Sequence, residues 1–528
     1  MSVVVKETFH DKYFTEDEIV ACLSVIDGKK TFGEIDIKDV FHSQVPNKGT
    51  LGNLMEMSVL GMKQNSLQNA DLEITFNNGI THSTELKTTG VHDRELADGE
   101  TYHAKECTSL TAVSIGTIEH ETWEESHYYN KLAHLLWVFY FYKRNEGQER
   151  VPYEEYNRFP VLGYKFTHIV DRPTDLAKFK SDWEKTRNYI INANKSANPE
   201  ELYPLLHESI KRDLFFVDIA PRYQKANKEL GIPSHTPRFR IKKPYVNAIF
   251  QEFWNELHNK TSSLEHLEEN YASFDELDAA LHSLTETYKG KTIEELVNMF
   301  NIPVKDNDIN KVTKSITEQI VVRMIGCTSK KISNIDLFSR IGIQAKTITT
   351  TTSGARTEDT KLFTMDLDEI QNVELPFEES SCYQYFNDYQ FLCIIFEEPS
   401  TEAPLKNNKF LGFKRLVFTD EIIETTVKEV YDKTCNLINN HEVVERYCYT
   451  KAGVQRINPN GLPMVALNFP KSKDYNVFIR GTGQDSANKT WQFEGISADG
   501  TGIIKSYSLQ FWIKGKYITE LLSNIEYI

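Results

Sequence analysis

The chain has 528 residues, 40% hydrophobic and 12% aromatic, so it can bury several apolar cores and is not intrinsically disordered. Its 76 acidic and 60 basic residues give a net charge of −16, which at first sight argues against a nucleic-acid partner. No apolar run reaches the roughly 18 residues that a membrane helix needs. Seven cysteines without a CxxC pair and an N-terminal segment unlike a signal peptide predict a cytoplasmic protein with no membrane partner.

An internal repeat organises the chain. Four similar segments occur in the same order in both halves, and they begin at Gly28 and Gly290, Trp123 and Phe377, Leu135 and Phe391, and Phe239 and Phe511. We therefore predict two homologous modules, residues 1–259 and 286–528, joined by an acidic helical connector at 260–285. In each module strands alternate with helical segments, which predicts an α/β fold with a mixed central sheet flanked by helices.

A hairpin is predicted over residues 71–88, with a turn at Asn77-Asn78-Gly79. A two-residue loop would pair Asp71 with Leu86 and place a carboxylate on the apolar face. A three-residue loop with a left-handed Gly79 pairs Asp71 with Glu85 instead. That register gathers one largely apolar face, namely Leu72, Ile74, Phe76, Ile80, Thr84 and Leu86. Because a slip of one residue exchanges the two faces, we predict the three-residue loop.

The other face of this hairpin carries Asp71, Glu85 and Lys87. Two carboxylates with a lysine beside them suit Mg²⁺, which prefers oxygen ligands and can polarise a phosphoryl oxygen. Lys87 could orient the attacking water or offset the developing negative charge. From these three residues alone, a solvated strand face is the commoner explanation.

The surrounding motifs change that balance. Thr-Phe-Gly-Glu begins at Thr31, Lys-Gly-x-x-Gly-x-x-x-Glu at Lys48, and Thr-Trp-Glu-Glu-Ser-His at Thr122. With Asp71…Glu85-x-Lys87 they resemble, in order and spacing, the MutH family of methyl-sensitive DNA endonucleases. The double-length chain is similar to the Sau-type restriction enzymes, in which a second MutH-like module follows the first.

The resemblance implies a restriction-endonuclease-like core that cuts DNA at GATC with Mg²⁺ held by Asp71 and Glu85. By position, Asp71, Glu85 and Lys87 match the catalytic residues of the family. Glu56 matches its helix carboxylate and Lys131 its additional active-site lysine. Asp71 and Glu85 are further apart in sequence than their MutH counterparts, and the longer hairpin absorbs this difference.

Two basic segments of the first module fall where MutH has DNA-contacting loops. Arg222 matches a family lysine, although Ala220 replaces a family arginine. The second segment supplies three further candidates for DNA contact, which are Arg238, Arg240 and Lys242. Arginine forks suit guanine edges, and lysines suit phosphates. A solvated basic strand is the alternative.

The second module has lost the acidic positions. Glu56 aligns with Val322, Asp71 with Leu337, Glu85 with Gln344 and Lys131 with Tyr385, while Lys346 remains. This set cannot hold a divalent cation, so we expect no nuclease activity there. Arg480, Trp512 and Lys514 are its candidates for DNA contact, and the resemblance implies binding of a further GATC site that activates the first module. A purely structural duplicate is the alternative.

These observations predict a prokaryotic type II restriction endonuclease that hydrolyses double-stranded DNA at unmethylated GATC sites, with a cognate methyltransferase in the same system. The alternatives are a mismatch-repair nicking endonuclease and a non-catalytic protein that senses DNA methylation. The net charge is compatible with all three, because DNA binding depends on local fields and the basic segments are separated from the acidic ones.

Overall fold

The structure is a computed structural model that describes residues 12–26, 28–43, 47, 49–63, 70–93, 102–143, 151–194, 199–220, 236–355, 358–373, 375–400, 402–483 and 489–528. The chain divides into two compact units. The first unit contains the described parts of Met1–Asn145 and Val151–Leu277, together with Asp336–Gly342. The second unit contains Asp278–Ile335 and Ile343–Ile528.

The first unit is built on a mixed sheet. Its strands are β1 (Tyr13–Thr15), β2 (Leu72–Thr75), β3 (Thr81–Asp93), β6 (His134–Phe141) and β7 (Val161–His168) in spatial order, with β4 (Tyr102–Ala104) paired to β3. The pairs β1–β2 and β3–β6 are parallel, whereas β2–β3 and β6–β7 are antiparallel. The predicted mixed central sheet is confirmed.

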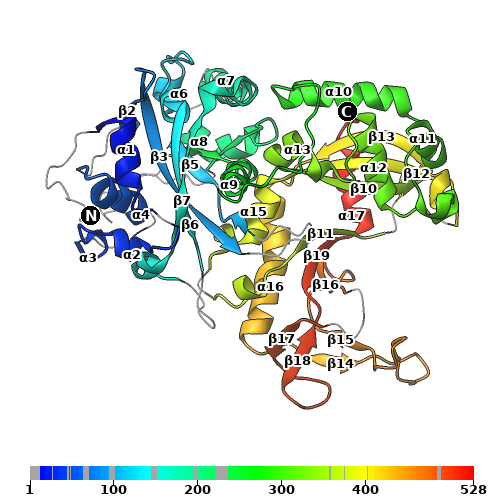
Figure 1. Ribbon diagram of the computed structural model, residues 1–528. Helices are drawn as coiled ribbons and strands as arrows, with labels where there is room; N and C mark the ends of the chain where they lie inside the picture. The colour runs from blue at the N-terminus through cyan, green and yellow to red at the C-terminus, as the bar shows by residue number, and fades with distance from the viewer. Residues whose placement is uncertain are drawn as a thin grey trace. The chain divides into compact units, whose positions relative to one another are not determined.

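Helices lie on both sides of this sheet, as Figure 1 shows. One group consists of α1 (Glu16–Leu23), α2 (Phe32–Ile35), α3 (Val40–Ser43), α4 (Thr50–Leu54) and the π-helical turn η1 (Met55–Val59). The other group contains α5 (Ile115–Ile118), α6 (His127–Leu132), α7 (Pro173–Asn194), α8 (Pro199–Ile210) and α9 (Lys243–Leu257). A second, three-stranded sheet has the order β5 (Thr108–Ala112), β9 (Arg238–Ile241) and β8 (Val217–Ile219).

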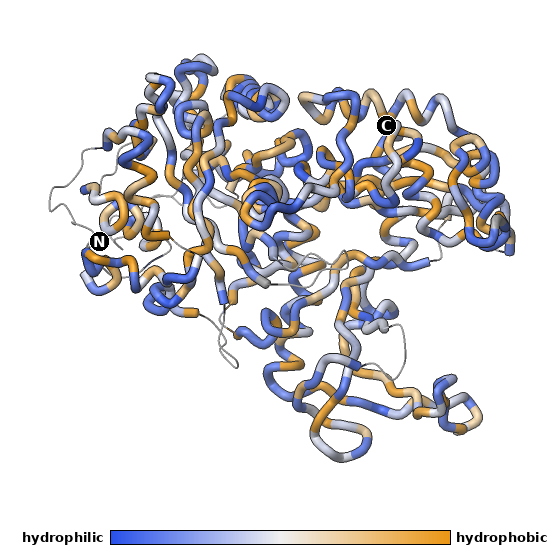
Figure 2. The backbone as a smooth tube through the Cα atoms, in the orientation of Figure 1, coloured by the Kyte–Doolittle hydropathy of each residue, from blue (hydrophilic) through white to orange (hydrophobic). Residues whose placement is uncertain are grey.

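The central strands supply the core of the first unit. Seven of the eight residues of β6 are buried, as expected for a strand covered on both faces. Figure 2 shows hydrophobic residues along these central strands. Leu72, Ile74 and Leu86 from the hairpin pack into the same core as Leu136 and Val138 of β6. This packing fixes the hairpin against the sheet.

The second unit repeats these connections. Its sheet has the order β10 (Ile343–Thr351), β12 (Gln390–Glu398), β13 (Lys409–Leu416), with β10–β12 parallel and β12–β13 antiparallel, as in β3–β6–β7. A second sheet of β11 (Thr360–Thr364), β19 (Leu509–Ile513) and β16 (Val477–Gly481) has the pairing pattern of β5–β9–β8.

The other elements of the second half are helices and two short hairpins. The hairpins are β14 (Glu445–Tyr447) with β15 (Val465–Leu467), and β17 (Trp491–Glu494) with β18 (Ile503–Ser506). The helices are α10 (Phe274–Tyr288), α11 (Ile293–Met299), α12 (Ser315–Met324), α13 (Asp336–Ile341), α14 (Leu367–Ile370), α15 (Ser381–Asp388), η9 (Ile422–Val427), α16 (Lys428–Asn439) and α17 (Gly515–Ser523).

Matching local contacts explain why the two halves share these elements. Thr31 and Glu34 form a capping box at the start of α2, and Thr292 and Glu295 form the same box at α11. Ser126 and Ser380 each accept a hydrogen bond from the backbone N–H three residues later, which starts α6 and α15.

Two segments differ from the sequence expectation. The connector expected to be helical over 260–285 forms a helix only from Phe274, and Leu264 and Leu267 precede it. Helix α13 belongs to the first unit although it comes from the second half of the chain. Its Arg340 donates to Asp175 of α7 and Glu252 of α9, at 3.2 and 2.9 Å.

Within the described part of the chain, no helix is both long and apolar enough to span a membrane.

Candidate active site

The β2–β3 hairpin has the register of the three-residue loop. Leu72 pairs with Thr84 and Glu73 with Ser83, which brings Asp71 opposite Glu85. Gly79 has φ +81°, the left-handed conformation that the prediction requires. The turn closes with the N–H of Phe76 donating to the carbonyl of Ile80 at 3.0 Å. Ile80, expected on the buried face, is 54% exposed because it ends the turn rather than lying in the sheet.

Glu85 is the centre of the charged face. Its side chain is 4% exposed and accepts from Lys87 Nζ at 2.7 Å and from Lys131 Nζ at 3.1 Å to each oxygen. Lys131 lies on α6, whose N-cap is Ser126, and the Ser126 hydroxyl also donates to the carbonyl of Trp123 at 2.7 Å. Asp71 Oδ2 accepts from the backbone N–H of Leu86 at 3.0 Å. Asp71, Glu85, Lys87 and Lys131 therefore lie together.

Glu56 joins this group from the π-helical turn η1. Burial, and then the nearby charges of Asp71 and Glu85, raise the pKa of Glu56 from 4.5 to about 7. Burial and the charge of Glu85 likewise raise the pKa of Asp71 from 3.8 to about 6. Three carboxylates thus share one poorly hydrated environment in which their negative charges are incompletely balanced.

This donor set fits a hard divalent cation. In the described part of the chain no three His, Cys, Asp or Glu side chains are already arranged as a metal site. The two ammonium groups hold Glu85 instead. Oxygen ligands from Asp71 and Glu85, with Glu56 beside them, are those that Mg²⁺ prefers. A cation would offset both the burial of these carboxylates and their mutual repulsion, which together raise the pKa values of Glu56 and Asp71.

A histidine cluster, which the sequence analysis missed, lies at one end of the same strands. His82 is on β3, His134 begins β6 and His168 ends β7. The Nδ1 atoms of His134 and His168 are 2.8 Å apart, and the rings of His82 and His134 have centroids 3.9 Å apart. Burial, and then His82 and His168, lower the pKa of His134 to about 3. Only the strand pairing brings these residues together, so no sequence motif marks them.

The basic residues predicted to contact DNA in the first unit have different surroundings. Arg238 is exposed on β9. Arg240 donates two hydrogen bonds from its guanidinium group to the two carboxylate oxygens of Asp218. Lys242 is 3% exposed and donates to the carbonyl of Leu214. Arg222 lies outside the described residues.

The second unit places other side chains at the equivalent strand positions. Gln344 pairs with Phe391 on β12 as Glu85 pairs with Leu135 on β6, and Lys346 occupies the position of Lys87. Lys346 Nζ and the hydroxyl of Tyr385 both donate to the carbonyl of Leu362, at 3.4 and 2.7 Å. In the first unit Lys87 and Lys131 donate to the carboxylate of Glu85. Their counterparts in the second unit, Lys346 and Tyr385, therefore donate to a backbone carbonyl instead.

One alignment from the sequence is wrong. Leu337, aligned with Asp71, lies in helix α13 of the first unit and not before a strand of the second. The described sheet of the second unit begins at β10, without a counterpart of β2. The strand position of Asp71 is thus missing there, because the chain forms a helix at that point.

The candidate DNA contacts of the second unit lie near its second sheet. Arg480 on β16 stacks over the ring of Trp512 at 4.7 Å and pairs with Asp359 at 2.9 Å. Lys514 is the residue that precedes α17. Arg480 on β16 is opposite Gln510 on β19. In the first unit the same register places Ala220 opposite Arg238. Arg480 therefore takes the position of Ala220, and Gln510 that of Arg238.

Residues 60–159 match the family model described as DNA mismatch repair enzyme MutH. The matched segment includes the hairpin, α6 and β6, and so contains Asp71, Glu85, Lys87 and Lys131. The search of curated proteins found no match to the chain.

Proposed function

We propose, from the MutH-like endonuclease domain that the first unit contains, that this chain is a type II restriction endonuclease that hydrolyses double-stranded DNA at unmethylated GATC sites with Mg²⁺. The observation that carries the proposal is the convergence of Asp71, Glu85, Lys87 and Lys131 within the matched segment. The GATC specificity follows from the sequence resemblance, and a cognate methyltransferase would protect the host DNA.

The arrangement suggests how the residues divide the work. Asp71 and Glu85 would hold the cation, which supplies a polarised phosphoryl oxygen and a more acidic water. Lys87 and Lys131 both bind the Glu85 carboxylate and balance its charge. Lys87, two residues from Glu85 on β3, would orient the attacking water and offset the negative charge that develops on the phosphoryl group. Glu56, the third carboxylate of this group, would help to balance the charge of the cation.

We propose that Arg238 contacts DNA in the first unit, since it is the exposed cation of β9. Contacts through Arg222, Arg240 and Lys242 remain predictions from the resemblance. The second unit, with Gln344 and Lys346 in place of Glu85 and Lys87, would bind a further GATC site through Arg480, Trp512 and Lys514 and activate the first. Exchange of Arg480 and Lys514 for alanine should then reduce cleavage of two-site DNA to the rate seen with one-site DNA.

A nicking endonuclease of mismatch repair is the second candidate, because the matched family is described by that role. A plasmid assay with Mg²⁺ separates the possibilities. Double-strand cutting of unmethylated plasmid, with methylated plasmid intact, supports a restriction enzyme. Nicking alone would identify the repair-type enzyme, and binding without any cleavage would contradict both.

A further inference from the structure

The second unit carries a projecting β arm, which we define as residues 446–467. At its base β14 pairs with β15, with Arg446 opposite Ala466. Beyond these strands the chain folds back twice, and the turns close with Gly453 N–H donating to Thr450 and Gly461 N–H to Asn458. Both glycines have positive φ and open space where a side chain would stand. The arm is thus an ordered ribbon with two exposed tips.

This arm is a departure from the repeat. Between its long helix α7 and strand β8 the first unit has helix α8, whereas between α16 and β16 the second unit has the arm. Pro470, three residues after the arm, accepts a hydrogen bond from Ile479 N–H of β16 at 2.9 Å. The segment that follows the arm is therefore bound to the strand that carries Arg480.

The tips and edges of the arm expose apolar side chains. Tyr449, Val454, Ile457 and Leu462 are each about half exposed or more, at 56, 63, 51 and 49%. A folded protein gains nothing from leaving four such side chains in water on one projection. Grouped exposure of this kind marks a binding surface.

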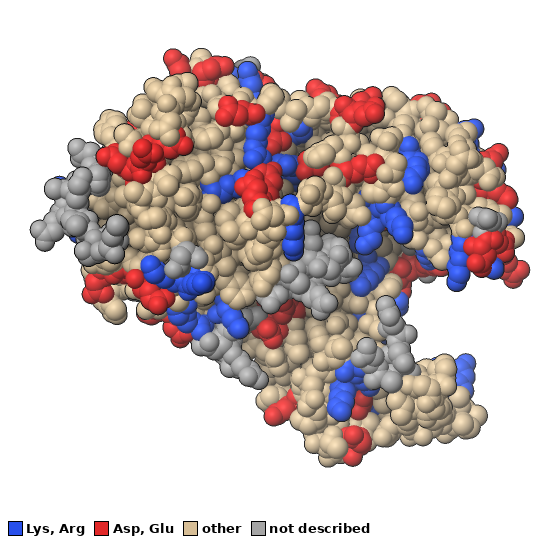
Figure 3. Space-filling view, viewed as in Figure 1, with Lys and Arg blue, Asp and Glu red and all other residues tan. Residues whose placement is uncertain are grey.

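Charge identifies the partner. The arm contains Arg446, Lys451 and Arg456, in a chain whose net charge is −16. The nearest acid in sequence is Glu445, the first residue of β14, and it forms an ion pair with Lys489 at 3.7 Å. All three cations are exposed. The face of the arm visible in Figure 3 likewise shows basic but no acidic side chains. A polyanion is the partner that such a surface fits.

We propose that the arm binds duplex DNA, with the three cations on the phosphates and the apolar tips inserted in a groove. Two-stranded ribbons enter DNA grooves, and in proteins that bind the minor groove Leu and Ile side chains act as wedges between base steps. The proposal rests on the proposed function for the identity of the nucleic acid. It adds a contact surface that has no counterpart among the described elements of the first unit.

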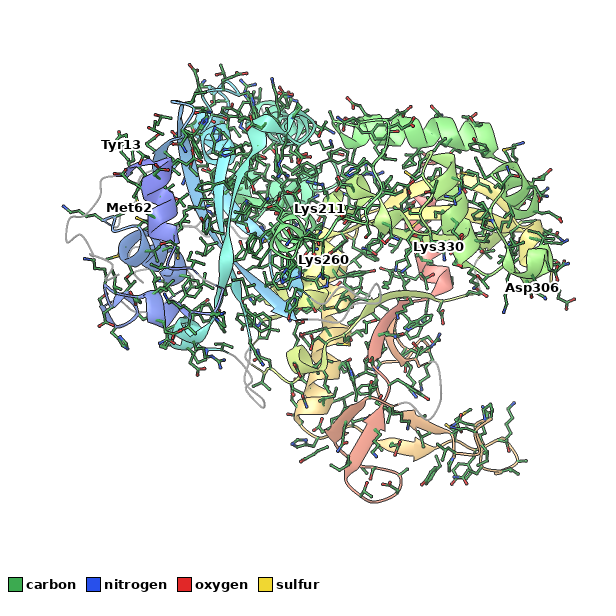
Figure 4. The ribbon with its side chains drawn as sticks, viewed as in Figure 1. Tyr13, Met62, Lys211, Lys260, Asp306 and Lys330 are labelled. Carbon is green, nitrogen blue, oxygen red and sulfur yellow. The ribbon has the colours of Figure 1, made fainter. Side chains whose placement is uncertain are left out.

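The test uses the full chain with Lys87→Ala, so that DNA is bound but not cut, and a fluorescent duplex that contains GATC. In this background we compare Arg446→Ala/Lys451→Ala/Arg456→Ala with a control that removes the same charge, Lys260→Ala/Lys305→Ala/Lys330→Ala. The control lysines are exposed, and Figure 4 shows Lys330 well away from the arm within the second unit. The arm variant should bind about tenfold more weakly, with a salt slope reduced by about two to three, whereas the control should change little.

A second variant, Ile457→Ser/Leu462→Ser, tests the wedge. It should weaken binding while leaving the salt slope unchanged, because it removes no phosphate contact. Equal affinity and slope for the arm variant and the control would overturn the proposal. So would a dimer of the full chain that the serine variant converts to a monomer, because the tips would then bind a second copy. Failure of the Lys87→Ala chain to bind DNA at all would instead contradict the proposed function.

Discussion

Glu85 binds the ammonium groups of Lys87 and Lys131. Its substitution should therefore lower the free energy of unfolding. In Glu85→Gln, Lys87 and Lys131 would lose their hydrogen bonds to the shared carboxylate, while Asp71 and Glu56 would still balance part of their charge. We therefore expect a loss of about 1–2 kcal/mol in the free energy of unfolding, less than for a buried ion pair whose partner is left uncompensated. Urea unfolding measures it.

Glu73→Gln is the matched control for this change. Glu73 lies on the same face of the hairpin and pairs with Lys12, but both side chains are more exposed than Glu85. Its loss should cost less than about 1 kcal/mol. Equal effects of the two substitutions would contradict the proposed role of Glu85 as the centre of the site.

The histidine cluster makes stability depend on pH. The pKa of His134 is about 3 in the folded chain against 6.5 for a free histidine, so the unfolded state takes up the proton first. The stabilisation is complete above pH 6.5 and is lost as the pH falls towards 3. The melting temperature should therefore fall on acidification from pH 7.5 to 5.5, and by a smaller amount in His134→Leu. An unchanged pH dependence in that variant would show that other groups control it.

At the scale of elements, the β2–β3 hairpin shows which features of the fold can be predicted from the sequence. We predict its register because a slip of one residue would turn the charged side chains to the buried face. The strand pairing and the left-handed conformation of Gly79 confirm this register. The contact of Lys131 with Glu85 came from a resemblance and not from any pattern, because the residues are 46 positions apart. The place of α13 could not be predicted, since its contacts lie on helices distant in sequence.

Helix α13 ties two helices of the first unit together. Arg340 binds Asp175 and Glu252, while Arg172 also binds Glu252 at 2.7 Å. In Arg340→Leu, Asp175 would remain largely buried without its ion-pair partner. We expect a loss of about 3 kcal/mol, with faster hydrogen exchange in α7 and α9.

Arg323→Leu is the control, because Arg323 lies on α12 of the second unit and donates to the carbonyl of Cys327. Its effect on hydrogen exchange should remain in that unit. Arg340→Lys should recover only part of the loss, since one ammonium group cannot reproduce the guanidinium contacts. If Arg340→Leu left exchange in α9 unchanged, the tie between the two helices would be disproved.

At the scale of the whole molecule, the two units share a strand order and local caps but differ in charge at the site. Truncation after residue 285 would remove α13 from the first unit as well as nearly all of the second unit, and it would cut helix α10. Loss of activity on truncation would then have two causes. The activating role of the second unit is therefore better tested by substitutions in the full chain.

The net charge of −16 is a sum over the whole chain and does not describe the local charge of any one surface. The candidate metal site gathers three carboxylates in the first unit, and the arm of the second unit carries three cations. The proposed metal site and the proposed arm contacts thus lie in separate parts of the chain, and their electrostatic requirements do not conflict.

We propose that Lys87 acts in a metal-dependent cleavage site. The most direct measurement compares the wild-type chain and Lys87→Ala in cleavage of unmethylated GATC plasmid with Mg²⁺, with duplex binding measured in parallel. We expect Lys87→Ala to lose cleavage by at least a factor of about 100, while its affinity for the duplex stays within about threefold. Cleavage at the wild-type rate by Lys87→Ala would contradict the role proposed for Lys87.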